Sequence, residues 1–337
     1  MPPGASLRRA KPGCARGRLR LKPEERAQAV AQAISGGDLR AAARLMRDLD
    51  DGVPGAREAL AALYGRTGRA FVVGVTGAPG VGKSTLVDAL VAVYRATGVR
   101  VGVVAVDPSS PFSGGALLGD RVRMQRHATD PGVFIRSLAT RGRLGGLSRS
   151  TIASVAVLDA AGFDVIFIET VGVGQAEIDV ADAADVVVVV TAPGLGDEIQ
   201  ALKAGLLEIA DVLVVNKADR EGADRAAADL TAMLALGARP GPAIVRTAAA
   251  TGAGLPELVA ALITLRAIPE ADRAARRRRQ AARQIVALAA ERARDAAHEA
   301  IGGGPAPAGP LASIVDDVAA RKVDPWSAVE VLATGRA

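Results

Sequence analysis

The chain has 337 residues, half of them apolar but only 2% aromatic, so one large or two smaller domains can bury a core of aliphatic side chains. One cysteine, Cys14, excludes an internal disulfide and a multi-cysteine metal site, and two histidines, His127 and His298, leave little for a histidine-based metal centre. The net charge of +6 is typical of a nucleic-acid or membrane partner, but seven bases and no acid lie in residues 1–23, which leaves −1 for the rest.

Residues 1–22 are predicted to form a disordered basic tail, since they contain Pro, Gly and Arg without apolar periodicity. The segment has no apolar stretch like that of a secretory signal. Its Arg content is typical of a mitochondrial transit peptide, but a single Ser and two early prolines favour a tail on a cytoplasmic protein. The longest apolar runs, such as Val186–Val190, are far shorter than the roughly 20 residues of a membrane span, so we expect no membrane partner.

Residues 23–68 are predicted to be a small helical segment. Apolar residues recur there at helical spacing, and two Gly-containing stretches, 36–37 and 52–55, interrupt the pattern. The spacing predicts two or three helices.

Residues 69–268 have a different pattern, in which short β-branched runs alternate with Ala-rich, helix-like stretches. The strand candidates are 71–75, 101–106, 133–137, 163–169, 185–191, 212–215 and 243–246. Near-continuous apolar strands separated by helices are typical of a parallel sheet covered on both faces. We therefore predict a doubly wound α/β domain with a mostly parallel sheet.

Residues 269–337 are predicted to be a helical arm. It contains one long helix over 271–300, a break at the Gly- and Pro-rich residues 302–310, and a last helical segment over 311–334.

The basic run Arg276–Arg279 in this arm leaves two interpretations open. It could bind an anion, but its Ala-rich context and the acids that follow favour the solvated face of an amphipathic helix. Ile285, Leu288 and Ala289 would then form the buried seam of the helix, in a structural or dimer-contact role.

The most specific motif is G-x-x-x-x-G-K-S, between the first strand candidate and a helical run. Its glycines let backbone N–H groups turn toward a phosphate, and the helix that follows presents its N-terminal dipole to the same anion. Lys83 adds a positive charge for the β- and γ-phosphates, and the Ser84 hydroxyl is a ligand that Mg²⁺ prefers. The candidate GTP-binding residues here are Gly77, Ala78, Pro79, Gly80, Val81, Gly82, Lys83, Ser84 and Thr85.

A second motif, N-K-x-D at Asn216, Lys217 and Asp219, follows the sixth strand candidate. The Asp219 carboxylate can accept two hydrogen bonds from the N1–H and N2–H₂ groups of guanine, and adenine would leave that charge unpaired. Asn216 can bond the other edge of the base, and the Lys217 stem can cover its plane. A third guanine-binding loop is expected after the last strand candidate, at Thr247, Ala248 and Ala249.

Three acids lie at or just beyond the ends of predicted strands: Asp107, Asp120 and Glu169. In open α/β sheets, ligands bind at the carboxyl ends of the strands. Acids there can hold Mg²⁺ through water or orient the attacking water, so we predict metal-binding and catalytic roles for these three residues. Ser84 is predicted to be a further metal ligand, and Lys83 a catalytic cation. The alternative is that one of the acids caps a helix or pairs with a nearby arginine.

The Gly-rich loops of the domain are candidate switches, because such loops can order around a γ-phosphate and relax after hydrolysis. The switch candidates are Gly172, Gln175 and Lys203, although a solvated helix position is an equal alternative for Lys203. No single residue stands out as a catalytic glutamine or an arginine finger. Gln175 and the arginines at 121, 123, 141 and 143 all remain open.

Four runs of the chain, GAPGVGKST, VDPSSPFSGGALLGDRVRM, ETVGVGQAE and NKAD, resemble in this order the methylmalonyl-CoA mutase-associated GTPases, called MeaB in bacteria and ArgK in older usage. The likeness extends from about Gly37 to Leu332. It implies a homodimeric, Mg²⁺-dependent GTPase that binds an adenosylcobalamin-dependent acyl-CoA mutase, gates its cofactor loading and protects it from inactivation. Residues 269–337 would then be the dimerisation arm.

The resemblance also implies roles for particular residues. Lys83 would be the phosphate-binding lysine, the three acids at 107, 120 and 169 the magnesium and switch acids, and Lys203 a mobile-loop lysine. The family usually has a Ser-Ala pair in the third guanine loop, where this chain has Thr247-Ala248, and Thr keeps the hydroxyl.

Three other functions fit the sequence less well. A nickel metallochaperone needs soft or imidazole ligands, which one cysteine and two isolated histidines hardly provide. A kinase would usually read adenine, which N-K-x-D opposes. A nucleic-acid-binding protein would be expected to carry stacking aromatic residues, which are nearly absent, so no nucleic-acid partner is expected. We interpret His127 and His298 as helix-surface or packing residues.

Overall fold

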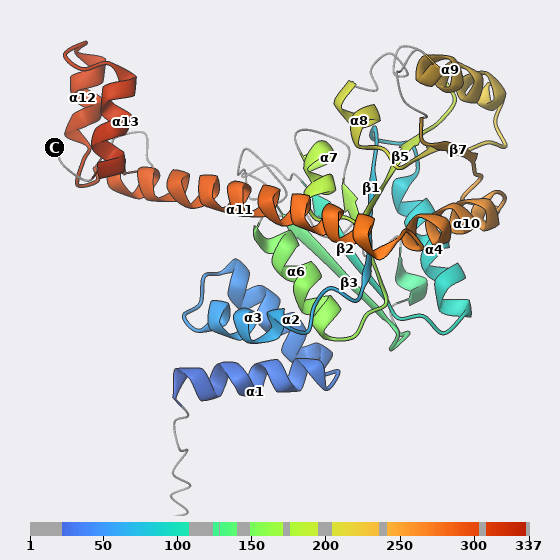
Figure 1. Cartoon of the computed structure of the whole chain (residues 1–337), viewed down its shortest axis with the longest axis horizontal. Coiled ribbons are helices and arrows are strands. Elements are labelled where there is room, and N and C mark those ends of the chain that lie inside the picture. The colour runs from blue at the N-terminus through green and yellow to red at the C-terminus, as the bar shows by residue number, and fades with distance from the viewer. Residues whose placement is uncertain are drawn as a thin grey trace, which may run out of the picture.

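The computed structural model describes residues 22–107, 124–127, 129–139, 149–170, 176–194, 204–235, 241–302 and 308–334. Within them, seven strands form one sheet with helices on both faces (Figure 1). The strands are β1 (Phe71–Thr76), β2 (Val101–Asp107), β3 (Val133–Ala139), β4 (Val165–Thr170), β5 (Val186–Thr191), β6 (Val212–Val215) and β7 (Ala243–Arg246). Of the tail predicted at 1–22, only Lys22 belongs to the described residues.

The sheet is parallel throughout, in the order β3-β2-β4-β1-β5-β6-β7. Strands β1, β4, β5 and β6 are buried along their whole length, because helices cover the aliphatic side chains of both faces. The predicted doubly wound α/β fold is confirmed. Every strand begins and ends within two residues of its predicted limits, since most of them are runs rich in β-branched residues.

The hydrophobic core has one layer on each face of the sheet. On one face, α4 (Lys83–Ala96) and α10 (Leu255–Arg266) bury leucines such as Leu90 and Leu258 in the same apolar cluster as the odd-numbered valines of β1. On the other face, α6 (Arg149–Ala160), α9 (Ala223–Ala235) and the short 3₁₀ helix η2 (Val180–Asp182) bury Val157, Leu230 and Val180. Three further short elements are η1 (Gln125–His127), α7 (Ala176–Asp179) and α8 (Ala204–Ile209).

The predicted helical segment before the sheet consists of three helices, α1 (Pro23–Ser35), α2 (Leu39–Asp50) and α3 (Ala56–Tyr64). They pack on α6, and their buried side chains, such as Ile34 and Leu63, belong to the same apolar cluster as that face of the sheet. Asp38 begins α2 by accepting hydrogen bonds from the N–H groups of Arg40 and Ala41.

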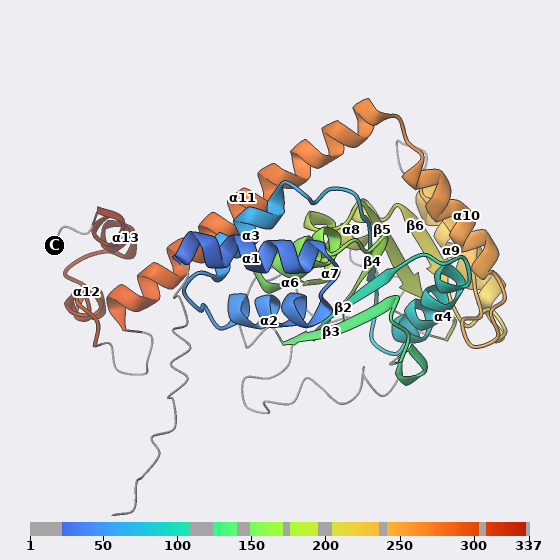
Figure 2. The same ribbon diagram turned by 90° about the horizontal axis from the view of Figure 1, so that it is seen from below.

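The chain ends in an arm formed by α11 (Glu270–Ile301), α12 (Ser313–Ala319) and α13 (Pro325–Thr334). Two perpendicular views show α11 crossing the body of the protein and carrying α12 and α13 beyond it (Figure 1 and Figure 2). No helix among the described residues is both long and apolar enough to cross a membrane.

The seam predicted for α11 is not buried within the single chain. Ile285 is 68% exposed, Ala289 is exposed, Leu288 is half-buried, and no residue from Glu270 to Ile301 is buried. The helix is attached to the body by Arg and Gln side chains instead. An amphipathic pattern shows that two faces of a helix differ, but it does not show what each face meets.

The last helical segment, predicted as one over 311–334, is divided into α12 and α13. Pro325 has no N–H group and disfavours a helical conformation at the residue before it, so a helix cannot run through this position without distortion. Asp324 then begins α13, because its carboxylate accepts hydrogen bonds from Trp326 N at 2.9 Å and Ser327 N at 3.1 Å.

Candidate functional site

The loop between β1 and α4 needs glycine at both of its ends. Gly77 has φ +135°, and a Cβ there would lie 2.0 Å from the Val190 carbonyl oxygen. Gly82 has φ +95° and precedes the first turn of α4, where a Cβ would lie 2.5 Å from Asn216 Nδ2. The loop therefore curls closely around the end of the sheet and exposes the N-terminus of α4 to an anion.

Lys83, at the start of α4, is buried in this loop. Its Nζ donates hydrogen bonds to the carbonyl oxygens of Gly77 at 2.7 Å and Ala78 at 2.8 Å. Burial lowers the pKa of Lys83 to about 8, while the nearby carboxylates of Glu169 and Glu177 oppose this shift. The site thus holds a desolvated amine whose protonated form an incoming phosphate would stabilise.

Ser84 and Glu169 come together beside Lys83. Ser84 Oγ donates a hydrogen bond to Glu169 Oε1 at 2.5 Å, and both side chains are buried. Glu169 lies at the end of β4, which pairs with β2 so that Ala105 is opposite Glu169. The last residue of β2, Asp107, therefore ends the neighbouring strand at the same edge, although its side chain is outside the described residues, as is all of Asp120.

The N-K-x-D loop is joined to the phosphate loop by its own side chains. Asn216 Nδ2 donates to the Val81 carbonyl at 2.9 Å, and Lys217 Nζ donates to the Gly80 carbonyl at 2.7 Å. Asp219, two residues after Lys217, is exposed. The two sequence motifs, which are more than a hundred residues apart in the chain, thus form one site at the carboxyl edge of the sheet.

Asn216 also holds the third loop. Its Oδ1 accepts hydrogen bonds from Thr247 Oγ1 and from Ala249 N, both at 3.1 Å, and the side chain is only 2% exposed. The threonine hydroxyl is therefore used, as the comparison with the usual serine predicts. Asn216 thereby fixes the three loops to one another. Its amide nitrogen carries two N–H donors, so the second one can still serve the predicted hydrogen bond to guanine.

Glu177 is a candidate residue that no sequence motif indicated. It lies at the start of α7, is 5% exposed, and its charge acts on Lys83. Its position eight residues beyond Glu169 in ETVGVGQAE is the only signal that the sequence offers.

The structure does not describe the predicted switch residues. Gly172, Gln175 and Lys203 lie outside the described residues, as do the arginines at 121, 123, 141 and 143.

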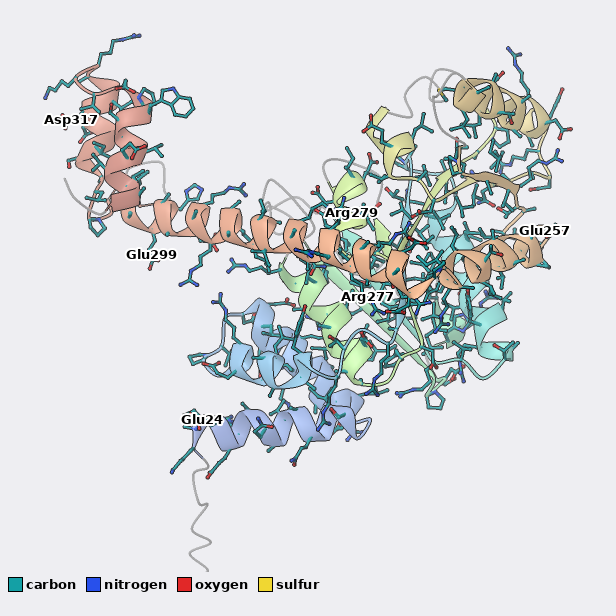
Figure 3. The ribbon with its side chains drawn as sticks, in the orientation of Figure 1. Glu24, Glu257, Arg277, Arg279, Glu299 and Asp317 are labelled. Carbon is teal, nitrogen blue, oxygen red and sulfur yellow. The ribbon has the colours of Figure 1, made fainter. Side chains whose placement is uncertain are left out.

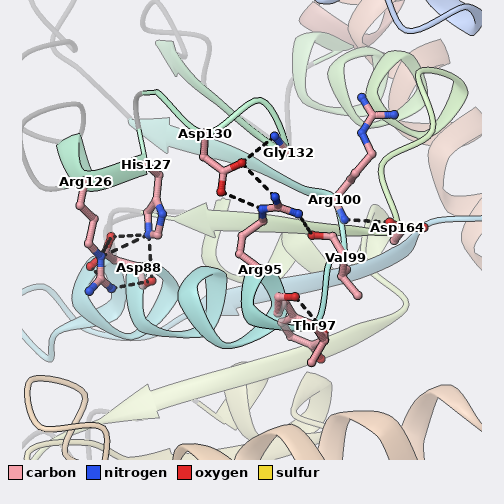
Figure 4. Close-up of polar contacts among 11 residues, drawn as sticks. Asp88, Arg95, Thr97, Val99, Arg100, Arg126, His127, Asp130, Gly132 and Asp164 are labelled. Carbon is pink, nitrogen blue, oxygen red and sulfur yellow. Dashed lines mark hydrogen bonds and ion pairs between the residues drawn. The ribbon is translucent and has the colours of Figure 1, made fainter.

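His127 packs against α4, the helix that follows the phosphate loop (Figure 4). Its Nε2 lies 3.1 Å from Asp88 Oδ1, and Arg126 Nε donates to the same carboxylate at 3.0 Å. On the same helix Arg95 pairs with Asp130 at 2.9 Å. These contacts attach η1 and the start of β3 to α4. Within the described residues, no group of three His, Cys, Asp or Glu side chains could hold a metal ion.

Known proteins match the chain over most of its length. A family model described as methylmalonyl Co-A mutase-associated GTPase MeaB matches residues 43–301. A relative from Pyrococcus abyssi, named as a GTPase, is 56% identical over 230 residues, which are 66% of this chain and 70% of the relative. The mouse protein named methylmalonic aciduria type A homolog, mitochondrial, is 41% identical over 195 residues, 56% of this chain and 47% of the mouse protein.

A solved structure described as a LAO/AO transport system kinase has the same fold. It superposes with a TM-score of 0.66 at 23% identity, over 93% of this chain and 98% of the other. At this level of identity, the likeness supports the architecture alone.

Proposed function

Since the chain belongs to the family of methylmalonyl-CoA mutase-associated GTPases, we propose that it serves an adenosylcobalamin-dependent acyl-CoA mutase as a nucleotide-driven chaperone. The chain is a GTPase, which converts GTP and water to GDP and phosphate. In the proposed role, this reaction is the switch that gates loading of the cobalamin cofactor and protects the mutase from inactivation.

The proposal depends most on the connection between the phosphate loop and the N-K-x-D loop. Asn216 and Lys217 donate to consecutive carbonyl groups of the phosphate loop, those of Val81 and Gly80. In this proposal, a nucleotide whose phosphates lie on α4 directs its base toward Asp219, which follows Lys217 by two residues. The exposed Asp219 carboxylate can accept from the N1–H and N2–H₂ groups of guanine, and adenine lacks this pair of donors.

In this proposal, Lys83 is the cation that binds the nucleotide phosphates. In the structure it donates to the carbonyl groups of Gly77 and Ala78, which are neutral partners. The β- and γ-phosphates would replace them with anionic partners and so raise the pKa of Lys83. The amine would then be fully charged when the terminal phosphate is transferred, where stabilisation of negative charge is the main catalytic term.

The donors beside Lys83 fit Mg²⁺. Ser84 Oγ and Glu169 Oε1 are oxygen ligands at the end of the phosphate loop, and Mg²⁺ takes few protein oxygens because it keeps waters and binds phosphate oxygens of the nucleotide. Bound there, Mg²⁺ neutralises charge on the phosphates. We propose Ser84 and Glu169, with Asp107 and Asp120, as the residues that hold the ion directly or through water, and Glu169 as a group that orients the attacking water.

The arm at 269–337 is proposed as the dimerisation region. Its last helix carries Trp326, which is 84% exposed, and Val329, which is 56% exposed. Exposed apolar side chains of this size are more typical of an interaction surface than of a free surface. A second copy of the chain would cover them.

The partner proposal is tested by capture of purified candidate mutases on the immobilised full-length protein. The capture is done with GDP, with a non-hydrolysable GTP analogue and without nucleotide. We expect a complex with one acyl-CoA mutase whose amount depends on the nucleotide. Failure of every cobalamin-dependent mutase to bind in all three states would overturn the chaperone role and leave the GTPase activity unaffected.

A further inference from the structure

The short helix η2 lies directly on the strand that carries the phosphate loop. Gly74, in the middle of β1, has no side chain to keep η2 away. A Cβ there would lie 2.5 Å from Val180 Cγ2 and 3.1 Å from Ala184 Cβ. Val180 is completely buried by this contact. Residues 180–184 thus rest on β1 only three residues before Gly77, the first residue of the phosphate loop.

The other side of the same segment is covered by polar side chains of α11. Gln284 Nε2 donates to the Asp182 carbonyl at 2.7 Å, and Arg283 donates to the Ala181 carbonyl at 3.4 Å. Gln280 reaches the Ala184 carbonyl at 3.5 Å.

Two ion pairs strengthen this contact. Arg283 Nε lies 3.0 Å from Asp182 Oδ1. Arg276 donates to the Asp185 carbonyl and also pairs with Asp211 at 2.6 Å, just before β6. The side chains at 276, 280, 283 and 284 recur at helical spacing, so a single face of α11 holds main-chain oxygens of four out of five consecutive residues.

The segment held in this way is continuous with α7, which carries Glu177. Glu177 is buried at the start of α7, three residues before η2, and its carboxylate is near enough to act on the charge of Lys83. On its far side α7 meets α8, where Gly205 allows close contact: a Cβ would lie 2.9 Å from Ile178 Cδ1. A shift of η2 along β1 would therefore move Glu177 relative to Lys83.

Beyond η2, α11 is attached to the body again at the start of α6. Arg149, the first residue of α6, lies 2.9 Å from Glu291 and also pairs with Asp295. No residue of α11 is buried, so polar contacts carry most of the attachment. Polar contacts of this kind hold two elements in register, but separating the elements costs less free energy than separating an apolar interface.

From these contacts we propose that α11 is a positioning element for GTP hydrolysis. The side chains of Arg276, Gln280, Arg283 and Gln284 fix residues 181–185, and through them Glu177, beside Lys83. A partner or a second copy that displaces the C-terminal arm thereby changes the hydrolysis rate. The inference rests on the GTPase function and extends it to regulation of the same site by α11.

Single substitutions on α11 test this role in the full-length protein. We expect Gln284→Ala and Arg283→Ala each to lower kcat for GTP roughly three- to tenfold, the usual effect of losing one such polar contact, with GDP affinity changed less than about twofold. Arg283→Lys, which keeps the charge, should recover part of the rate. The matched control is Arg279→Ala on the same helix, since Arg279 is exposed (Figure 3).

The outcomes separate a positioning role from a structural one. If both variants hydrolyse GTP at the rate of the Arg279→Ala control, the inference is wrong. It is also wrong if GDP affinity and the melting temperature fall in step with kcat, because that result indicates general loss of structure. A wild-type protein that does not hydrolyse GTP would instead contradict the proposed function.

Hydrogen–deuterium exchange of the wild-type protein provides a test without substitutions. With GDP and with a non-hydrolysable GTP analogue, we expect the peptides that cover 276–291 to exchange at different rates, while those of β6 exchange alike. Equal exchange of 276–291 in the two states would overturn the coupling.

Discussion

The sheet and helix α11 belong to the same body, with η2 packed between them, but different forces hold them in place. Strand β5 is buried over all six residues, and its valines lie in apolar layers on both faces of the sheet. Helix α11 has 32 residues, none of them buried, and it is attached through guanidinium, amide and carboxylate groups. A buried Val or Leu side chain contributes about 1.5–3 kcal/mol, and a net hydrogen bond about 0.5–1.5 kcal/mol.

This difference suggests a division of roles. The apolar sheet provides a rigid frame, on whose carboxyl edge the three nucleotide loops are held to within hydrogen-bond distance of one another. The polar attachment of α11 allows the arm to move relative to that frame. Substitutions in the two regions should therefore have effects of different kind and size.

The largest expected effect on stability is in the frame. Phe167 is fully buried in β4, so Phe167→Ala should lower the free energy of unfolding by about 3–5 kcal/mol. Ile285→Ala on α11 should change it by less than about 0.5 kcal/mol, because Ile285 is 68% exposed. Urea denaturation of the full-length protein measures both. Equal losses would mean that an apolar surface covers Ile285 in solution, and the comparison would not hold.

Asp219→Asn should change base selection without affecting the frame. Loss of the carboxylate removes the acceptor for two guanine donors, so the ratio of kcat/KM for GTP to that for ATP should fall by roughly a hundredfold. Since Asp219 is exposed, the free energy of unfolding should stay the same. Glu221→Gln, an exposed acid two residues away, is the control and should keep the ratio. An unchanged ratio in Asp219→Asn would remove Asp219 from the site.

The buried amine of Lys83 predicts a pH dependence of GTP binding. Its pKa is about 8 in the free protein, and the phosphates should raise it, so binding takes up a proton above pH 8. Between pH 8 and pH 9, GTP affinity should fall by up to about tenfold.

Lys83→Arg is the control for this pH dependence. An arginine keeps its charge, so the affinity of this variant should not depend on pH between 8 and 9. The same slope in both proteins would assign the proton to another group.

The same pKa has a consequence for the free protein. The pKa of Lys83 is lower in the folded state than its ordinary value of 10.5, so the unfolded chain binds more protons between about pH 8 and 10.5. The contribution of this group to the free energy of unfolding therefore rises with pH in that window.

The smallest effect is expected at the contact between α6 and α11. Arg149 is partly exposed, with 30% of its side chain accessible, so Arg149→Ala should lower the free energy of unfolding by less than about 1 kcal/mol. Amide exchange should become faster in the peptide that covers 287–301. A loss as large as that of Phe167→Ala would mean that α11 belongs to the rigid frame.

The frame could be predicted from the sequence almost completely, whereas of the arm the helices could be predicted but the position of α11 could not. A run of β-branched residues such as Val186–Thr191 predicts a buried strand. The glycines of Gly77–Ser84 indicate a phosphate loop, because they give its backbone conformational freedom. The position of α11 depends on which of its faces meets a neighbour, and Arg and Gln contacts to main-chain oxygens leave no apolar periodicity in the sequence.

Parts of the site also could not be predicted from the sequence. The N-K-x-D motif indicated Asn216 as a ligand of guanine, but it did not indicate that the same amide joins three loops, because this depends on how three strand ends meet in space. Glu177 acts on Lys83 through the folded arrangement of α7 beside the phosphate loop, and a lone acid after a Gly-rich loop has no spacing rule that would reveal it.

Comparison of GTP and ATP hydrolysis tests the central claim most directly. If the phosphate loop and the N-K-x-D loop form one guanine nucleotide site, the wild-type protein with Mg²⁺ should have a kcat/KM for GTP at least roughly a hundredfold above that for ATP, and Lys83→Ala should lose nearly all hydrolysis. Equal turnover of GTP and ATP by the wild-type protein would contradict the account.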